Sequence, residues 1–425
     1  MILQSTILQT SQRQWDTLST NKHFARELLP QVHFPVSDFA VVISGVRRCG
    51  KSVLLAQLAS RCKAEHPIFY LNFDAPQLYG FTYDDYQRLD DAIRSYPEKP
   101  LLFLDEVQVV EGWELYVRGK LDEGYQVVVS GSNASMLSRE LGTKLTGRHL
   151  SYELFPFSYK EFCGFLRLDG NETSQTRYME QGGFPLYLKL QDEDILNNLL
   201  SDILYRDVTS RYGVRDYGKL KELLMLLLNN VGNMVSANKL RQVLQINSAT
   251  TVNEYFSYLQ QSYLFDFVPV YSASEKVRMV NPKKVYCVDT GLITVCSTAL
   301  STNIGHRLEN MVYGELRRRY KSVYYFNHDG HECDFVAMHN NRCAELVQVC
   351  ADFNTDTYQR EVQGMLAAME ALSVTQGSIV TLRQTDGFIE GNKHIRILPF
   401  HRWALNDTTT HTTTHTHTTA NTTSN

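Results

Sequence analysis

Short apolar runs alternate with amphipathic segments over the first third of the chain. A strand that is buried on both faces is apolar throughout, so such runs are typical of parallel sheets that helices cover on both sides. The pattern therefore predicts an α/β domain built on a doubly wound parallel sheet. The expected strands are residues 39–44, 68–74, 101–104 and 125–130, and the expected helices are residues 51–63, 81–96 and 113–122.

The first expected strand is followed by the sequence GVRRCGKS at residues 45–52, which is a complete Walker A motif and predicts a P-loop NTPase. Gly45 and Gly50 let the backbone curl so that its N–H groups face phosphate oxygens. Lys51 supplies a cation for the β- and γ-phosphates, and Ser52 supplies a hydroxyl ligand for Mg²⁺. The expected nucleotide-binding residues are Gly45, Val46, Arg47, Arg48, Cys49, Gly50, Lys51, Ser52 and Val53.

A second motif, LLFLDE at residues 101–106, has the form of a Walker B element. The carboxyl end of a parallel strand is where open α/β sheets bind their ligands. We therefore expect Asp105 to hold Mg²⁺ together with Ser52, and Glu106 to orient or deprotonate an attacking water. Glu106 and Lys51 are the first two predicted catalytic residues.

Two further candidates follow the second motif. Ser132 and Asn133 stand at the end of the next apolar run, where they can sense the γ-phosphate or simply form a turn and a helix N-cap. These two interpretations are about equally supported. Arg148 is the third predicted catalytic residue, as an arginine finger acting within the chain or from a neighbouring subunit, although most single arginines are ordinary surface residues.

The second half of the chain begins with a helix-rich region. Helical patterns at residues 219–230, 235–244 and 249–262, followed by an apolar run at 264–268, predict a winged helix-turn-helix. Residues 248–262, the expected recognition helix, contain no Lys or Arg. Phosphate contacts require cations, so a structural or protein-contact role is favoured over reading duplex DNA.

Several motifs together resemble a known family. GVRRCGKS, LLFLDEVQ, VVVSGSNASML, LTGRHLSYELFPFSYKEF and QGGFPLYL occur in the order and spacing of bacterial and archaeal AAA-type ATPases whose C-terminal half is the domain of unknown function 4143. The resemblance covers about residues 20–400 and implies ATP as the nucleotide. It also implies the P-loop roles given above and matches Arg148 to the family's Gly-Arg motif. Arg206 and Asp207 match a recurrent Arg-Asp pair to which the resemblance gives no role.

The last part of the chain resembles the restriction-endonuclease-like fold. Glu309 on an expected helix, Asp334 on an expected strand and Gln348 on the next strand occupy the positions of a metal-dependent nuclease site. Gln348 replaces a carboxylate, and Cys350 replaces the catalytic lysine. Glu345 is three residues out of register and should face the other side of the sheet. The pattern favours a degenerate site over an active nuclease.

Composition limits the compartment and the partners. The net charge is -4, from 42 basic and 46 acidic side chains, so nucleic-acid binding would need a local basic patch. The eight cysteines form no CxxC pair, and neither a secretory signal nor a membrane-length apolar run is visible, which predicts a cytoplasmic protein without a membrane partner. A protein or nucleic-acid partner of unknown identity and a homo-oligomer both remain open.

These observations predict an ATP-hydrolysing AAA-type switch or motor, with Mg-ATP as ligand, coupled to a degenerate nuclease-like module. The alternative is an ATP-regulated, metal-dependent nuclease acting on DNA or RNA. A small-molecule kinase is disfavoured because Glu106 suits a water-directed reaction. The expected parts are a peripheral segment at 1–38, an ATPase domain with lid at 39–195, a winged-helix-like region at 196–275, a nuclease-like domain at 276–403 and a disordered tail at 404–425.

Overall fold

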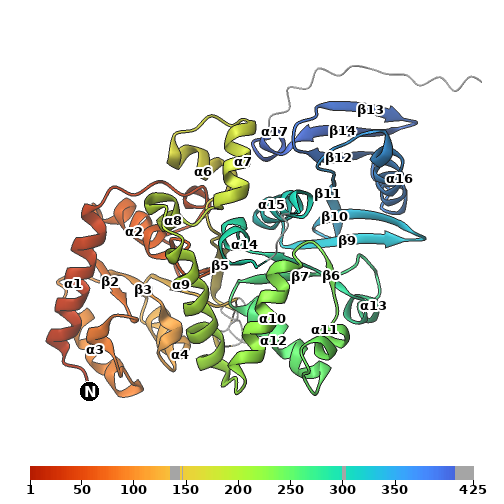
Figure 1. The fold of residues 1–425 in the computed structure, drawn as a ribbon. Helices are drawn as coiled ribbons and strands as arrows, with labels where there is room; N and C mark the ends of the chain where they lie inside the picture. The colour runs from red at the N-terminus through yellow and green to blue at the C-terminus, as the bar shows by residue number, and fades with distance from the viewer. Residues whose placement is uncertain (135–143, 146, 299–302, 407–425) are drawn as a thin grey trace, which may run out of the picture.

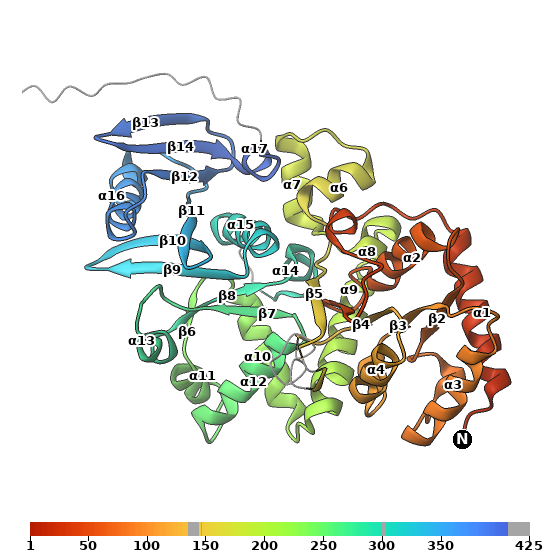
Figure 2. The same ribbon diagram turned by 180° about the vertical axis from the view of Figure 1, so that it is seen from behind.

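The computed structural model describes residues 1–134, 144–145, 147–298 and 303–406. Within these residues the strands form a five-stranded, a three-stranded and a six-stranded sheet. The five-stranded sheet and the six-stranded sheet lie toward opposite ends of the molecule, with helices and the small sheet between them (Figures 1 and 2). Most of the predicted tail lies outside the described residues.

The five-stranded sheet is parallel throughout, with strand order β2-β3-β4-β1-β5. The four predicted strands are confirmed, and a fifth strand, β5, joins the edge beside β1. The strands are β1 Ala40–Ser44, β2 Ile68–Asn72, β3 Leu101–Asp105, β4 Val127–Gly131 and β5 His149–Glu153. The segments around them are α1 Gln4–Thr20, η1 Leu29–Gln31, α2 Lys51–Cys62, η2 Pro76–Leu78, η3 Tyr83–Asp85, α3 Tyr86–Arg94, η4 Val107–Val109 and α4 Trp113–Asp122.

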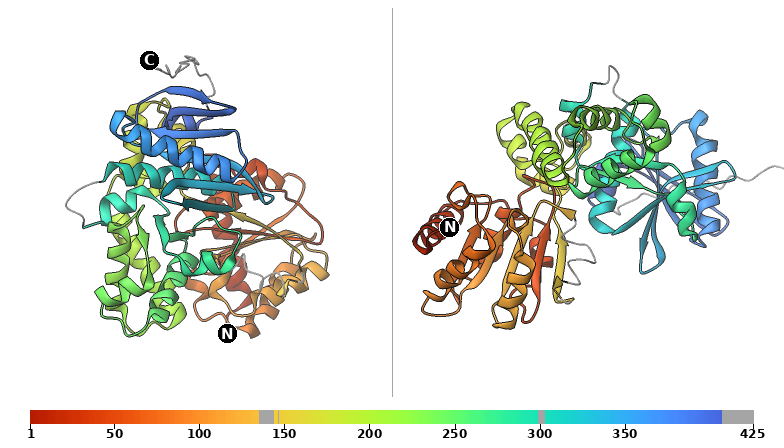
Figure 3. Two further views of the ribbon diagram at one scale, coloured as in Figure 1. Left: turned by 90° about the vertical axis from the view of Figure 1, so that its right-hand side faces the viewer. Right: turned by 90° about the horizontal axis from the view of Figure 1, so that it is seen from below.

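Alternate residues of each central strand enter different cores. Val41 and Ile43 pack with Leu54 of α2, whereas Val42 packs on the other face with Leu89 of α3. Helices thus cover both faces of the sheet, as the continuous apolar runs predicted, and the right-hand view of Figure 3 shows these layers with α1 at the outer edge. Each fully buried aliphatic side chain contributes about 1.5–3 kcal/mol to folding.

The middle of the chain is mainly helical. It contains α6 Tyr159–Leu166, α7 Glu172–Gln181, α8 Pro185–Leu190, α9 Asp194–Asp202 and the π-helical segment η6 Ile203–Ser210. The predicted helices of the winged-helix-like region are confirmed as elements, and an antiparallel sheet of order β6-β8-β7 accompanies them. These elements are α10 Tyr217–Asn229, β6 Met234–Val235, α11 Ala237–Val243, α12 Ala249–Gln261, β7 Phe265–Val268, α13 Glu275–Val280, β8 Lys283–Cys287 and α14 Thr290–Cys296.

The C-terminal sheet is mixed, with strand order β13-β14-β12-β11-β10-β9. The predicted helix around Glu309 is present, and so are the predicted strands that contain Asp334 and Gln348. The elements are α15 Ile304–Arg319, β9 Ser322–His328, β10 His331–His339, β11 Arg342–Val349, α16 Thr355–Ala371, β12 Gln376–Thr381, β13 Asp386–Glu390, β14 Lys393–Pro399 and α17 Phe400–Ala404. Among the described helices, none is both long and apolar enough to cross a membrane.

The QGGFP motif joins distant parts of the chain. A Cβ atom on Gly182, whose φ is +66°, would lie 1.9 Å from a carboxylate oxygen of Asp289, and a Cβ on Gly183 would lie 2.3 Å from the carbonyl oxygen of Phe157. The Gly183 N–H donates to Asp289 at 2.6 Å, and burial raises the pKa of this carboxyl to about 6. Side chains would prevent these approaches, so the motif has a packing role.

Candidate functional site

The loop between β1 and α2 carries the Walker A residues, and Lys51, Ser52 and Val53 form the first turn of α2. A Cβ on Gly45 would lie 2.0 Å from the backbone oxygen of Leu154, so only glycine fits there. The Cys49 thiol is fully buried and lies 3.3 Å from the same oxygen, and burial raises its pKa. Gly45 and Cys49 therefore both pack against the backbone of Leu154, the residue that follows β5.

A buried arginine from outside the motif also shapes the loop. Arg26 donates to the carbonyl oxygen of Cys49 at 2.7 Å and to that of Phe155 at 2.7 Å. Its guanidinium is paired with Glu161 at 2.8 Å, and both side chains are almost completely buried. Arg26 lies in a segment without a recognisable pattern, so this role could not be predicted.

Lys51 and Glu106, two predicted catalytic residues, meet at the mouth of the loop. The ammonium lies 3.2 Å from Glu106 Oε1 and donates to the carbonyl oxygens of Gly45 and Val46 at 3.2 and 3.3 Å. Burial would lower the pKa of Lys51, but the surrounding acidic groups, led by Glu106 and including Asp105, together outweigh it and the pKa rises. Burial would likewise raise the pKa of Glu106, but Lys51, the hydrogen bond from Gln108 and the charge of Arg47 together leave it lowered. Both groups are therefore charged at neutral pH.

Asp105 collects hydroxyl and amide donors from neighbouring strands. Its Oδ2 accepts from Ser52 at 2.5 Å, Tyr70 at 2.6 Å and Asn72 at 3.0 Å, and its Oδ1 accepts from Ser130. The predicted pair Ser52 and Asp105 is thus brought together. The other three donors were missed, although all lie at or near the carboxyl ends of strands beside β3, and that position was the available signal.

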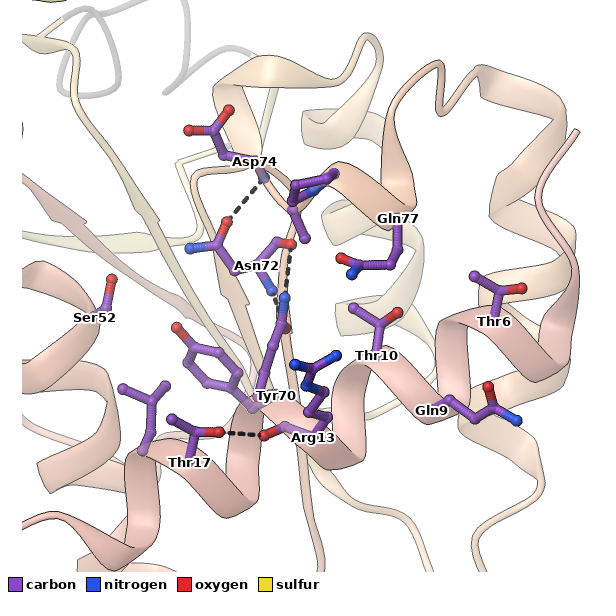
Figure 4. Close-up of a pocket in the computed structure, with 14 residues that line it drawn as sticks. Thr6, Gln9, Thr10, Arg13, Thr17, Ser52, Tyr70, Asn72, Asp74 and Gln77 are labelled. Atoms are coloured by element: carbon purple, nitrogen blue, oxygen red, sulfur yellow. Dashed lines mark hydrogen bonds between the residues drawn. The ribbon is translucent and has the colours of Figure 1, made fainter.

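A cavity of about 660 Å³ opens between α1 and the end of β2 (Figure 4). Ser52, Tyr70 and Asn72 line one side, and Arg13 projects from α1 on the other. Gln14 anchors this helix, because its side chain accepts from the Asn72 N–H at 2.8 Å and donates to the Asn72 carbonyl at 3.3 Å. The cavity therefore borders Ser52, one of the two predicted Mg²⁺ ligands.

The predicted sensor residues follow β4 and are almost fully buried. Gln108 donates to Glu106 at 2.5 Å and to the Ser132 hydroxyl at 3.2 Å. Ser132 in turn donates to Asp207 of η6 at 3.3 Å, and Asn133 donates to Tyr212 at 3.2 Å. Ser132 thus links the surroundings of Glu106 to the helical middle region through Gln108, and Asn133 contacts the same region.

The two loop arginines are ion-paired with that region as well. Arg47 holds Asp207 through two hydrogen bonds of 3.0 and 3.1 Å, and Arg48 lies 2.9 Å from Asp202. Burial would lower the pKa of Arg47, but Asp207, Glu106 and Asp74 together raise it above its usual value. Asp207, which the resemblance left without a role, is therefore a direct partner of the Walker A loop.

Arg148 occupies the opposite end of the sheet. It immediately precedes β5, whose first residue pairs with Ala40 at the amino end of β1, and its guanidinium lies 2.7 Å from Asp122. The Walker A loop follows the carboxyl end of β1, about 13 Å farther along four residues of strand. The expected contact with nucleotide within one chain is therefore incompatible with this placement, because parallel strands separate the two ends.

The nuclease-like candidates Glu309 and Asp334 meet around a lysine that the sequence did not indicate. Lys284 of β8 lies 2.9 Å from Glu309 Oε1 and 2.7 Å from Asp334 Oδ1, and Tyr286 donates to the same Glu309 oxygen at 2.6 Å. Burial and the charge of Asp334 raise the pKa of Glu309 to about 7. Both carboxylates thus form ion pairs with one buried ammonium group.

Gln348 completes the cluster without adding charge. It accepts from the Asp334 N–H at 2.9 Å and donates to Glu361 of α16, a buried carboxylate that sequence reasoning also missed. Glu345 instead accepts from Trp403 at 2.9 Å, on the other face as expected. The cluster borders a cavity of about 910 Å³. Within the described residues, no three His, Cys, Asp or Glu side chains are arranged to hold a metal ion.

Comparisons with known proteins identify the family. Uncharacterized protein MJ1544 of Methanocaldococcus jannaschii is 30% identical over 393 residues, which cover 86% of this chain and 88% of the relative. An uncharacterized protein of Haemophilus influenzae is 33% identical over 354 residues, which cover 79% of this chain and 88% of the relative. The chain belongs to the same family as these two proteins. A model described as an AAA domain matches residues 37–163, so the predicted AAA character is confirmed and includes all five parallel strands.

The expected family of the C-terminal half was wrong. Residues 172–303 match the domain of unknown function 8612, not 4143, and this match ends before Asp334 and Gln348. Among solved structures, the replication initiator DnaA bound to AMPPCP and single-stranded DNA aligns with 57% of this chain and 86% of its own, at 14% identity and a TM-score of 0.30. A score this low supports no further conclusion.

Proposed function

We propose that this AAA-domain protein binds Mg-ATP and hydrolyses it. The observation that carries the proposal is the ion pair of Lys51 with Glu106, at 3.2 Å, across the mouth of a Walker A loop. A cation for the phosphates and a charged carboxylate for water are thereby present at one place. The two groups hold each other until a polyphosphate replaces Glu106 as the partner of Lys51.

The donor set beside this pair fits a magnesium ion. Ser52 and Asp105 offer hard oxygen atoms 2.5 Å apart, and Mg²⁺ prefers such ligands together with phosphate oxygens and water. Bound there, the ion would neutralise charge on the phosphates. Glu106 accepts a proton from the water whose oxygen bonds to the γ-phosphorus, while the bond to the bridging β–γ oxygen breaks and ADP leaves. Ser132 and Asn133 are proposed to sense that change.

The finer assignments are also proposals. Residues 196–275 form a winged-helix-like contact module, and residues 276–403 form a restriction-endonuclease-like module whose site is degenerate. Lys284 supports the second assignment, because its ammonium is ion-paired with both of the carboxylates that a metal ion would need. The ATPase domain at 39–195 would act as a switch or motor on these modules.

An arginine finger supplied by a neighbouring subunit is the remaining role for Arg148. Mixing inactive Arg148→Ala and Lys51→Ala subunits tests it, because a role across subunits requires the mixture to recover turnover. No recovery would remove the proposed role across subunits and leave Arg148 in its ion pair with Asp122.

The central proposal is tested by phosphate release and by binding of a labelled ATP analogue. Lys51→Ala should lose binding. Glu106→Gln should retain binding and lose at least about 100-fold in turnover, because the amide keeps the shape but accepts no proton. Glu98→Gln is the matched control, since Glu98 is exposed ahead of β3. Wild-type turnover in Glu106→Gln would remove the assigned role.

A further inference from the structure

Arg47 lies inside the Walker A loop, two positions after Gly45, yet its guanidinium is turned onto another part of the chain. Its Nε and one terminal nitrogen bind both oxygens of Asp207, and the other terminal nitrogen lies 3.5 Å from Asp74. Its side chain is 14% exposed. A forked, nearly buried cation is therefore kept at the rim of the phosphate-binding loop by carboxylates on η6 and after β2.

The same carboxylate reaches the catalytic centre through a short chain of contacts. Asp207 accepts from Ser132, Ser132 accepts from Gln108, and Gln108 also donates to Glu106. The charge of Glu106 contributes to the raised pKa of Arg47, and Arg47 contributes to the lowered pKa of Glu106, so the two groups are close enough to act on each other. Arg47 thus lies near Glu106, the partner of the lysine that would bind the γ-phosphate.

We propose that Arg47 is this chain's own arginine for the γ-phosphate, and that Asp207 holds it away from that position until nucleotide binds. The proposal rests on the proposed ATPase function and assigns a further catalytic residue to it. A guanidinium forks onto phosphate as well as onto carboxylate, and the γ-phosphate carries more negative charge than Asp207. Arg148 leaves this task open, because it lies at the other end of the sheet.

The exchange has a structural consequence. When Arg47 turns to phosphate, Asp207 loses its bidentate partner, and η6 is attached to the ATPase domain by fewer bonds. The π-helical geometry of this segment fits such a role, because π-helical turns occur frequently at functional sites. Tyr212, just beyond η6, donates to Gln261 at 2.6 Å and stacks on Tyr258 with ring centroids 4.0 Å apart, which connects this segment to α12.

The opposing interpretation is a purely structural clamp between the loop and η6. A clamp depends on both partners equally, so removal of either residue should then lower stability and turnover together. If Arg47 is instead a catalytic arginine that Asp207 holds away from the phosphate, removal of Arg47 and removal of the Asp207 charge should have different effects on turnover. Loss of Arg47 should abolish its work on phosphate, whereas loss of the Asp207 charge should release Arg47 toward phosphate.

The experiment measures single-turnover hydrolysis, affinity for a labelled ATP analogue and melting temperature on the full chain. Arg47→Ala should lower the hydrolysis rate by about 100-fold or more with less than about fivefold loss of affinity. Arg47→Lys, which keeps a charge for Asp207 without the fork, should still lose at least about tenfold in rate. Asp207→Asn should retain the rate and tighten binding of the analogue. Arg206→Ala is the matched control, because Arg206 precedes Asp207 in the sequence and its guanidinium lies 3.6 Å from Asp74.

The outcomes separate clearly. Rates within threefold of wild type in both Arg47 variants would overturn the proposal, as would an Asp207→Asn protein that loses as much rate and melting temperature as Arg47→Ala. A wild-type chain that neither binds nor hydrolyses ATP would instead refute the proposed function itself. A wild-type chain that hydrolyses ATP and is insensitive to Arg47 would refute only the role of this arginine.

Discussion

Lys51 and Lys284 are both buried beside carboxylates, and they are held in different ways. Lys51 is ion-paired with one carboxylate, Glu106, and donates hydrogen bonds to two backbone carbonyl oxygens of the loop. Lys284 meets two carboxylates, Glu309 and Asp334, that side-chain and backbone donors also hold. The first lysine can exchange its partner for a phosphate, whereas the second completes a permanent, nearly neutral cluster.

The difference shows how the same residue type gives a binding group or a structural group. A binding lysine needs a partner that it can leave without stranding a buried charge, and Glu106 retains its bond from Gln108 when Lys51 moves away. Glu309 and Asp334 would be left with two buried like charges if Lys284 moved, which is costly at low dielectric. The predictions below test this contrast in order of decreasing effect.

The largest effect is expected for Lys284→Met. Methionine fills a similar volume but leaves Glu309 and Asp334 as uncompensated buried carboxylates, so the free energy of unfolding should fall by about 3–5 kcal/mol. Urea unfolding followed by circular dichroism measures the change. The double variant Lys284→Met with Glu309→Gln should recover part of the loss, because one charge is removed. An unchanged unfolding midpoint in the single variant would show that the ion pairs of Lys284 do not stabilise the fold.

An intermediate, pH-dependent effect is expected for Glu309→Gln. The pKa of Glu309 is raised from 4.5 to about 7 in the folded chain. A raised pKa favours the protonated form, so its stabilising contribution is complete below the unfolded pKa and is lost as pH rises through 7. The wild type should therefore lose about 3 kcal/mol of stability relative to Glu309→Gln over this interval.

Parallel urea titrations of the two proteins at about pH 5 and about pH 8 test this difference, because all other groups titrate in both. A difference that is the same at both pH values would show that Lys284 keeps Glu309 ionised throughout, against the direction of its pKa.

The smallest change in stability is expected for Lys51→Met. Glu106 keeps Gln108 and the nearby charge of Arg47, so unfolding should be easier by only about 1–2 kcal/mol. Nucleotide affinity should be lost in the same variant. Melting temperatures of Lys51→Met and Lys284→Met, measured side by side without nucleotide, give the comparison directly. Equal losses would contradict the distinction between an exchangeable and a permanent ion pair.

The sequence predicted well what local pattern determines. The strand before Lys51 and the strand ending at Asp105 are buried at every position and apolar up to their last residue, because both faces are covered, and this leaves an unambiguous signal. The edge strand β5, His149–Glu153, was missed because its residues are all half-buried and polar residues interrupt it. Ser52 and Asp105 could be paired from motif spacing alone.

The unpredicted site residues have no such local signal. Arg26 and Lys284 come from segments that are distant in sequence from the groups they hold, and an isolated charged residue looks like a solvated one until the fold brings its partner near. Asp207 was noticed only as part of a recurrent pair. Its function as the partner of Arg47 depends on how the middle region packs on the loop, which no pattern within either segment encodes.

The alkylation rate of the buried Cys49 thiol can report how often the Walker A loop opens. Burial raises its pKa, so in the closed loop almost no thiolate is present and no reagent can approach it. Alkylation at this position must then wait for the loop to separate from Leu154, and its rate reports how often that separation occurs. The alkylation rate of Cys49 thus measures loop openings that are too rare to be detected as a populated conformation.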